Sequence, residues 1–342
     1  MQAAILTKQE TLVFKDIAKP MPQSGEVLVA VAYAGVCRTD RKCYHMGQRD
    51  LTLPRILGHE VSGIVAAVGD GVTDYKIGER VQVHPGIGCG RCQHCIDGND
   101  HLCQEMQILG FHIDGAFSQY LLVPSQGVAR GIIQKVPAEL PLKTAVLCEP
   151  LACAVNMAGR LDFQNQKVLI IGGGVLGLLM GKLAQIKGCS DVIILEKEAA
   201  KIKIAQKMGI KCLPHDIDTS KIKEIWPHGA DISIPCCPQN DGFRRSIELL
   251  TTRGKLGFFS GLTADDAVCR DTLNLLHYKE LSLYGSYGCS LNNAQEALKL
   301  LTEYQEDFQL PTIYLALSEL ENVLKCWEVT ESVCFVVEFK GE

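Results

Sequence analysis

A continuous apolar run that ends in a glycine-rich turn constrains the fold of this chain more than any other feature. Residues 168–171 read Val-Leu-Ile-Ile, and glycines follow at 172, 174 and 177 before an apolar helical pattern. A second apolar strand pattern, over 192–195, ends in Glu196. A lone G-x-G-x-x-G is weak evidence. A strand before it, a helix after it and an acid after the next strand together predict a dinucleotide-binding turn in a parallel sheet.

Each residue of this Rossmann turn has a physical role. Gly172 permits the tight turn, Gly174 lets a pyrophosphate approach the backbone, and Gly177 lets the helix pack on the strand. The helix begins with Val175 and Leu176, whose free N–H groups lie at the positive end of the helix dipole and suit phosphates. We expect these five residues to bind the cofactor. The alternative is a glycine-rich turn in an unrelated βαβ unit.

Glu196 predicts which dinucleotide is bound. A carboxylate at this position accepts hydrogen bonds from the adenosine ribose hydroxyls and repels a 2′-phosphate. Lys197 and Lys201 moderate that repulsion, and Lys201 is itself a candidate cofactor contact. The sequence therefore favours NAD over NADP.

The patterning changes near residue 150. Before it, short alternating runs such as 25–35 and 60–72 are separated by glycines, which is typical of an antiparallel, barrel-like domain. After it, fully apolar strands alternate with helices, which indicates a parallel sheet covered on both faces. A helical pattern over 294–304 and a closing strand over 334–339 are expected to return to the first domain.

Composition excludes several classes of partner. The chain is 47% apolar and 21% charged, with a net charge of −5, which gives no basic footprint for nucleic acid or for an anionic membrane. The first fourteen residues do not resemble a signal peptide, and the run 168–180 is too short and glycine-rich to span a bilayer. The sixteen cysteines then suit a reducing cytoplasm, where we expect the protein.

Four of these cysteines form a compact motif, C-x2-C-x2-C-x7-C, within residues 86–105. Four thiolates this close together can surround one tetrahedral ion, and Zn²⁺ is the usual occupant of an all-cysteine cage. A disulfide knot and an iron–sulfur site are the alternatives. The predicted ligands are Cys89, Cys92, Cys95 and Cys103.

A second, more scattered set suggests a catalytic metal. Cys37 and His59 supply one thiolate and one imidazole, and a catalytic zinc needs a third protein ligand and an open position. Glu149 is the leading candidate for the third ligand. Taken alone, Cys37 or His59 could as well be a buried structural residue.

These motifs together resemble the zinc-containing medium-chain dehydrogenase/reductases, the alcohol and polyol dehydrogenase superfamily. The resemblance covers nearly the whole chain: it includes Gly58-His59-Glu60, the lobe cysteines and the segment 115–120, and Glu149-Pro150-Leu151 resembles the sorbitol dehydrogenase branch. It implies an α/β protein with a GroES-like β-barrel catalytic domain, a four-cysteine zinc lobe and a doubly wound parallel-sheet Rossmann domain that binds NAD. The expected bounds are 1–150 with 287–342 for the first domain, 86–105 for the lobe and 151–286 for the Rossmann domain.

The same resemblance implies roles for individual residues. Cys37 and His59 ligate the catalytic zinc, and Glu149 is the third ligand, directly or through water, with Glu60 and Cys148 as secondary candidates. The expected supporting roles are Asp40 orienting His59, Glu60 beside the ligands, Thr39 receiving the substrate proton and Arg38 at the cofactor pyrophosphate. Many relatives carry a histidine where this chain has Lys42, so the route by which the proton leaves stays open between Lys42 and His45.

The predicted activity is hydride transfer between NAD(H) and a secondary alcohol or ketone, most simply a polyol, sugar alcohol, cyclitol or amino-cyclitol. The alternatives are a threonine-type 3-hydroxy amino acid dehydrogenase and a non-catalytic zinc- and nucleotide-binding homologue. A zinc-free reductase of the same superfamily would lack the lobe cysteines. We expect two Zn²⁺ per chain and a homodimer or homotetramer, since the strand near 281–285 could pair across a two-fold axis.

Overall fold

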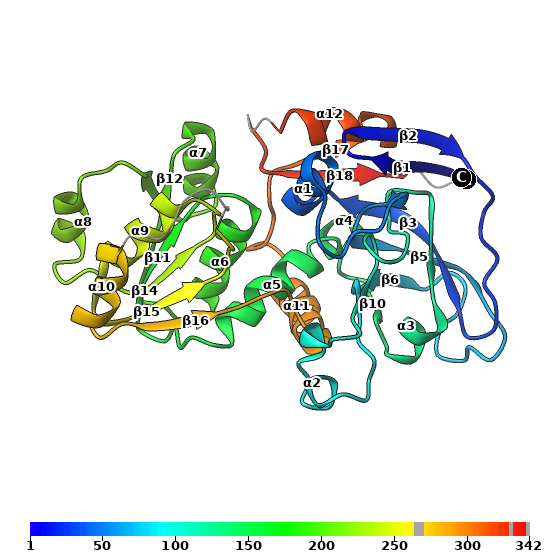
Figure 1. Ribbon diagram of the computed structural model, residues 1–342, viewed down its shortest axis with the longest axis horizontal. Helices are drawn as coiled ribbons and strands as arrows, with labels where there is room; N and C mark the ends of the chain where they lie inside the picture. Colours follow the sequence, from blue (N-terminus) through cyan, green and yellow to red (C-terminus); the bar gives the residue numbers. More distant parts are fainter. Residues whose placement is uncertain (263–269, 328–330, 340–342) are drawn as a thin grey trace. The chain divides into compact units, whose positions relative to one another are not determined.

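The computed structural model describes residues 1–262, 270–327 and 331–339 and divides into two compact units (Figure 1). The first contains Met1–Ala152 and most of the chain from Cys289 onward. The second contains Cys153–Gly288 and a short piece that ends at Val333. The boundaries expected from the sequence, after residues 150 and 286, lie two residues before these divisions.

The first unit is built on two β-sheets. The larger has the order β10-β6-β5-β3-β18-β17, with β9 also paired to β3, and the smaller has the order β2-β1-β4. The strands are β1 Gln2–Lys8, β2 Thr11–Asp16, β3 Val27–Gly35, β4 Arg55–Ile56, β5 Glu60–Val68, β6 Arg80–Val83, β9 Tyr120–Val123, β10 Ile133–Lys135, β17 Thr312–Leu315 and β18 Cys334–Glu338. Neighbouring strands are antiparallel except β17 and β18, which run parallel and depart from the expected pattern.

Short helices and one hairpin complete this unit. The helices are α1 Arg38–Met46, α2 Gln93–Ile96, α3 Ser125–Ala129, α4 Leu142–Ala145, α11 Leu291–Glu303 and α12 Leu320–Lys325, and the hairpin pairs β7 Gly86–Ile87 with β8 Gln107–Ile108. The expected helix over 294–304 is α11, which begins three residues earlier at Leu291 because Ser290 caps it through the backbone N–H of Asn293. Helix α5, Cys148–Ala158, carries the chain across the division between the units.

The second unit is a six-stranded parallel sheet in the order β13-β12-β11-β14-β15-β16. The strands are β11 Lys167–Ile171, β12 Asp191–Glu196, β13 Lys211–Pro214, β14 Ala230–Pro235, β15 Leu250–Phe258 and β16 Ser282–Gly285, and the helices are α6 Val175–Ile186, α7 Ala199–Lys207, α8 Thr219–Ile225, α9 Asn240–Glu248 and α10 Arg270–Tyr278. This is the doubly wound order expected from the sequence.

Strand β11 lies inside this sheet, between β12 and β14, and its side chains are buried. Residues 168–171 are at most 1% exposed, because helices cover both faces of a parallel sheet. The order of strands reverses at β11, between β12 on one side and β14 on the other. Ligands of such sheets bind beyond the carboxyl ends of the strands at this point, which is where the glycine turn follows β11. Among the described residues, no helix is long and apolar enough to cross a membrane.

Candidate functional site

The four predicted lobe cysteines come together in the structure. Their sulfur atoms all lie within 4.8 Å of one another. The sulfur atoms of Cys89 and Cys95 are 4.0 Å apart, and the backbone N–H groups of Cys89 and Cys92 point at the sulfurs of Cys103 and Cys89. All four are free thiols, so the disulfide alternative is wrong for this structure. Four converging thiols fit a tetrahedral Zn²⁺ with no position left for a substrate.

A second group of donors contains Cys37, His59 and Glu60, whose ligand atoms also lie within 4.8 Å of one another. Cys37 is the N-cap of α1, Glu60 is the first residue of β5, and His59 directly precedes that strand. Both His59 and Glu60 are 6% exposed. We call these three residues the distributed donor group, because a sulfur, a nitrogen and an oxygen from two elements make the donor set of a catalytic zinc.

Asp40 holds this group in place. It is fully buried, its Oδ2 accepts a hydrogen bond from the backbone N–H of Cys37 at 2.8 Å, and its Oδ1 lies 3.4 Å from Nδ1 of His59. A carboxylate next to Nδ1 fixes the orientation of the imidazole and leaves Nε2 for a metal ion. The structure thus brings together Asp40 and His59 as the resemblance implied.

Burial perturbs the acidities of the distributed donor group. Burial raises the pKa of the Cys37 thiol, although His59 opposes this effect. Burial also raises the pKa of Glu60 to about 8, and the charge of Glu149 adds to that increase. Burial lowers the pKa of His59, but Asp40 and Cys37 outweigh it, so that the net change is upward. Buried thiol and carboxyl groups of this kind need a cation to ionise, and Zn²⁺ fits that requirement.

Glu149, the expected third ligand, is not a member of the distributed donor group. It lies in the first turn of α5, where its Oε1 is 3.9 Å from the sulfur of Cys289. Cys148, a secondary candidate, is buried and its thiol points at the backbone oxygen of Ala294 at 3.3 Å. Glu60 instead supplies the oxygen donor. Its position directly after His59 shows from the sequence that Glu60 lies near the group, but the choice between Glu60 and Glu149 depends on tertiary structure.

The other residues of the first unit have visible partners. The backbone N–H of Thr39 points at the sulfur of Cys37 at 3.5 Å. The guanidinium of Arg38 lies 4.6 Å above the ring of Trp327, a contact that the sequence did not suggest. His45 is held by Glu10 at 2.8 Å and by the backbone oxygen of Leu324 at 3.1 Å.

The glycine turn of the second unit has the geometry that its sequence predicts. Gly172 has φ +104°, which favours glycine, and a side chain on Gly177 would meet the backbone oxygen of Gly172 at 1.9 Å. A side chain on Gly174 would meet open space, as expected where a ligand approaches the backbone. Val175 begins α6 directly afterwards.

Glu196 stands at the end of β12 and is bound to this turn. Its Oε2 accepts a hydrogen bond from the backbone N–H of Gly173 at 2.6 Å, and its Oε1 accepts those of Lys197 and Glu198. Lys201 is buried and donates to Glu198 at 2.5 Å. Glu196 is therefore fixed beside the glycines, whereas Lys201 is already paired with a carboxylate.

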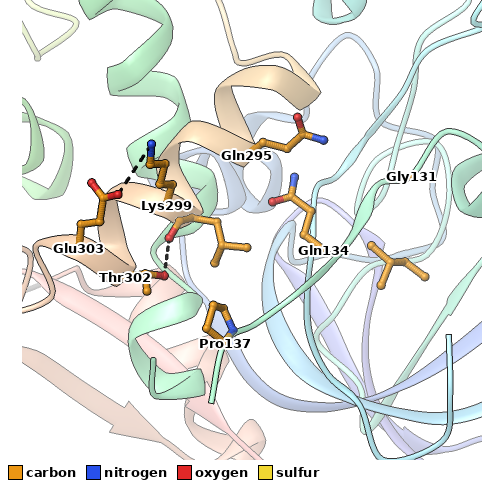
Figure 2. A pocket seen from close by; sticks show the side chains of 9 residues that line it. Gly131, Gln134, Pro137, Gln295, Lys299, Thr302 and Glu303 are labelled. Atoms are coloured by element: carbon orange, nitrogen blue, oxygen red, sulfur yellow. Dashed lines mark hydrogen bonds and ion pairs between the residues drawn. The ribbon is translucent and has the colours of Figure 1, made fainter. Parts of the chain in front are cut away.

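One cavity of about 540 Å³ in the first unit contains none of the predicted site residues (Figure 2). It lies between β10 and α11, and its wall includes Gln134, Leu298 and Thr302. The amide atoms of Gln134 are shielded from solvent and make no hydrogen bond in the described part of the chain. The charged groups in its wall, Lys299 and Glu303, pair with each other at 3.7 Å, and none of its lining residues belongs to a metal-donor group or to the glycine turn.

Comparison with known proteins points in the same direction as this geometry. Residues 23–136 match the alcohol dehydrogenase GroES-like domain, and residues 175–303 match the zinc-binding dehydrogenase domain. The chain is 33% identical to an L-threonine 3-dehydrogenase of Pyrococcus furiosus over 301 residues, which cover 84% of this chain and 83% of the relative. It is 30% identical to a 2-dehydro-3-deoxy-L-galactonate 5-dehydrogenase of Pseudoalteromonas atlantica, with coverage of 84% and 83%.

A solved structure is similar over almost the full length. A zinc-binding dehydrogenase of Sinorhizobium meliloti, determined with bound NADP, superposes with a TM-score of 0.90 at 27% identity and covers 99% of both chains.

Proposed function

Because the chain belongs to the zinc-containing medium-chain alcohol and polyol dehydrogenases, a family of oxidoreductases, we propose that it transfers a hydride between NAD(H) and a secondary alcohol or its ketone. The observation that carries this proposal is the distributed donor group, in which His59 and Glu60 are buried and Asp40 lies 3.4 Å from His59. A non-catalytic homologue would have no need to keep such a set together.

In this proposal Cys37, His59 and Glu60 hold the catalytic zinc and the lobe cysteines hold a second, structural zinc. A catalytic zinc supplies Lewis acidity that makes a bound alcohol more acidic, and NAD supplies the hydride acceptor. Glu149 was the third ligand expected from the sequence, and in this proposal Glu60 takes that place; the charge of Glu149 raises the pKa of Glu60.

The chain's own side chains have the remaining tasks. Asp40 keeps the His59 ring oriented, and its bond to the backbone of Cys37 fixes the start of α1. Thr39, on the first turn of that helix, is proposed to receive the substrate proton through its hydroxyl. The exit route of the proton stays open between Lys42 and His45, and a proton on His45 could pass to Glu10, whose Oε1 lies 2.8 Å from Nδ1.

NAD is the proposed cofactor because of Glu196. Its carboxylate is anchored to the glycine turn by Gly173 and cannot swing away from a nearby ribose without losing that hydrogen bond. A fixed negative charge accepts ribose hydroxyls and repels a 2′-phosphate. The NADP bound to the similar Sinorhizobium meliloti protein makes a direct comparison of the two dinucleotides necessary.

The proposed substrate is a secondary alcohol beside a further polar group. Polyols, sugar alcohols and cyclitols share this feature with 3-hydroxy amino acids. The relatives that act on L-threonine and on a sugar acid support both alternatives, so a threonine-type activity is the second candidate.

A substrate panel tests the proposal. The purified protein would be given NAD and, in turn, L-threonine, polyols, cyclitols and primary alcohols, while the absorbance of NADH is followed. We expect turnover of at least one secondary alcohol, two zinc ions per chain and no turnover by Cys37→Ser. One zinc ion per chain with no turnover across the panel would support a non-catalytic homologue.

We also propose a homodimer or a homotetramer. Strand β16 is one of the two edges of the parallel sheet, and Leu283 in it is 46% exposed. An unprotected edge strand can pair with its own copy across a two-fold axis. Light scattering of the native chain and of Leu283→Lys, which places a charge on that edge, tests this assembly. A monomeric native chain would overturn it.

A further inference from the structure

A cluster of charged groups surrounds Asp241 in the second unit, and of its members only Lys197 has a role predicted from the sequence. Asp241 lies in the first turn of α9. Its Oδ2 is 2.7 Å from Nε2 of His215 and 3.3 Å from Nζ of Lys197, and its Oδ1 is 2.7 Å from Arg244. The Asp241 carboxylate therefore contacts three side chains, each of which could otherwise bind an anion.

This cluster lies next to Glu196, which we propose to bind the adenosine ribose of the cofactor. Lys197 follows Glu196 directly, and the backbone N–H of His215 donates to the backbone oxygen of Glu196 at 2.9 Å. Burial raises the pKa of Cys237, two residues after β14, and the charges of Glu196 and Asp241 add to that increase while Lys197 opposes it. All of these groups belong to the second unit and lie at the carboxyl ends of β12, β13 and β14.

The exposure of the cluster suits contact with a ligand. The side chains of Lys197, Arg244 and Asp241 are 62%, 49% and 41% exposed, whereas His215 is 9% exposed beneath them. A phosphate could reach the two cationic groups without any opening of the fold. Lysine and arginine bind phosphates through charge-assisted hydrogen bonds, and an arginine near the ribose accommodates the 2′-phosphate of NADP in such sheets.

The charge of Asp241 decides whether those groups are available. Burial alone would raise the pKa of Asp241, but His215, Arg244 and Lys197 lower it to about 2, so the carboxylate is ionised at neutral pH. Arg244 is also paired with Glu248 at 2.6 Å. With Asp241 ionised, the cations are neutralised internally, and an incoming 2′-phosphate would compete with a carboxylate already in place.

We propose that Asp241 is a specificity-determining residue, which occupies Lys197, His215 and Arg244 in place of a 2′-phosphate and thereby reinforces the preference for NAD. The inference rests on the proposed function, because it requires a dinucleotide at the glycine turn. Asp241, on α9, would thus be a second negative charge, beside Glu196, that disfavours a 2′-phosphate.

The test uses binding rather than turnover, so it does not depend on the unidentified alcohol. Calorimetry on the full chain would compare 5′-AMP with adenosine 2′,5′-bisphosphate, which differ by the 2′-phosphate alone. In Asp241→Asn we expect the affinity ratio to move toward the bisphosphate by about tenfold, since an amide of the same shape no longer holds the cations as strongly. Asp218→Asn is the matched control, because this exposed acid caps α8 in the same unit.

The outcomes separate this inference from the proposed function. A native chain that binds neither adenosine fragment nor NADH would contradict the nucleotide site itself. A native chain that binds 5′-AMP, with an unchanged ratio in a folded Asp241→Asn, would overturn the role of Asp241. An equal shift in Asp218→Asn would also overturn it, because the effect would then be one of net charge.

Discussion

The two donor groups of the first unit differ in how the chain assembles them. The lobe cysteines lie within a run of fifteen residues, and all four donors are sulfur. The distributed donor group joins the start of α1 to the start of β5 and mixes sulfur, nitrogen and oxygen. A local all-thiolate set closes around its ion, whereas a mixed set of three leaves a position for substrate. The difference predicts that substitutions in the distributed donor group abolish activity, whereas substitutions of the lobe cysteines lower thermal stability.

The largest expected effect follows from loss of the distributed donor group. In Cys37→Ser or His59→Ala we expect no detectable turnover and the loss of one zinc ion per chain, with the melting temperature almost unchanged. Cys326→Ser is the control, because Cys326 is an exposed free thiol. Enzyme assays with metal analysis measure both quantities. Activity that survives complete loss of this zinc would contradict a catalytic role for the group.

The opposite result is expected for the lobe. Zinc binding contributes on the order of 10 kcal/mol to small structural sites, and about 1 kcal/mol moves the melting temperature of a large domain by roughly 2–4 °C. In Cys92→Ser we therefore expect melting about 10 °C lower or more, together with activity that persists at low temperature. Calorimetric scans beside assays at 10 °C and 25 °C would show it. If Cys92→Ser lost all activity at unchanged melting temperature, the comparison between the two groups would fail.

The loss of activity expected on substitution of Asp40 is intermediate, because Asp40 acts by orienting His59. Loss of a carboxylate that orients a metal-bound histidine costs about 10–100-fold in metal affinity or activity. We expect a decrease of that size in Asp40→Asn, with weaker zinc binding in competition with a chelator. Asp114→Asn is a suitable control, since Asp114 is an exposed partner of Arg55 in the same unit. Reduced activity with unchanged zinc affinity would indicate that Asp40 acts on the substrate instead.

The same contrast explains how much could be predicted from the sequence. The lobe was predictable because its spacing alone brings four thiols together, and β11 with the glycine turn was predictable because apolar strands and glycines have local causes. The position of Asp40 could also be predicted from the sequence, since it is three residues after Cys37 and completes the capping box of α1.

The remainder depends on distances that only tertiary structure sets. Glu60 and Glu149 are both acids in suggestive motifs, and the sequence does not show which one lies beside Cys37. The stacking of Arg38 on Trp327 joins residues almost three hundred positions apart. The parallel pairing of β17 with β18 likewise has no local signal, since a strand pattern does not reveal its partner.

The smallest effect concerns differences within the lobe. Backbone N–H groups of Arg91 and Cys92 stabilise the thiolate of Cys89 and lower its pKa to about 6, whereas burial raises the pKa of Cys95 to about 12. A thiol with a lowered pKa is ionised above that pKa and protonated below it. In protein stripped of zinc by mild chelation, we therefore expect iodoacetamide to modify Cys89 first, with a midpoint near pH 6, and Cys95 last. Mass spectrometry of the labelled peptides measures the order. All four cysteines could instead be labelled equally, with midpoints near the ordinary pKa of a thiol. That result would mean that the lobe unfolds without its ion, because the N–H groups that stabilise the Cys89 thiolate are in place only while the turn at residues 89–92 is folded.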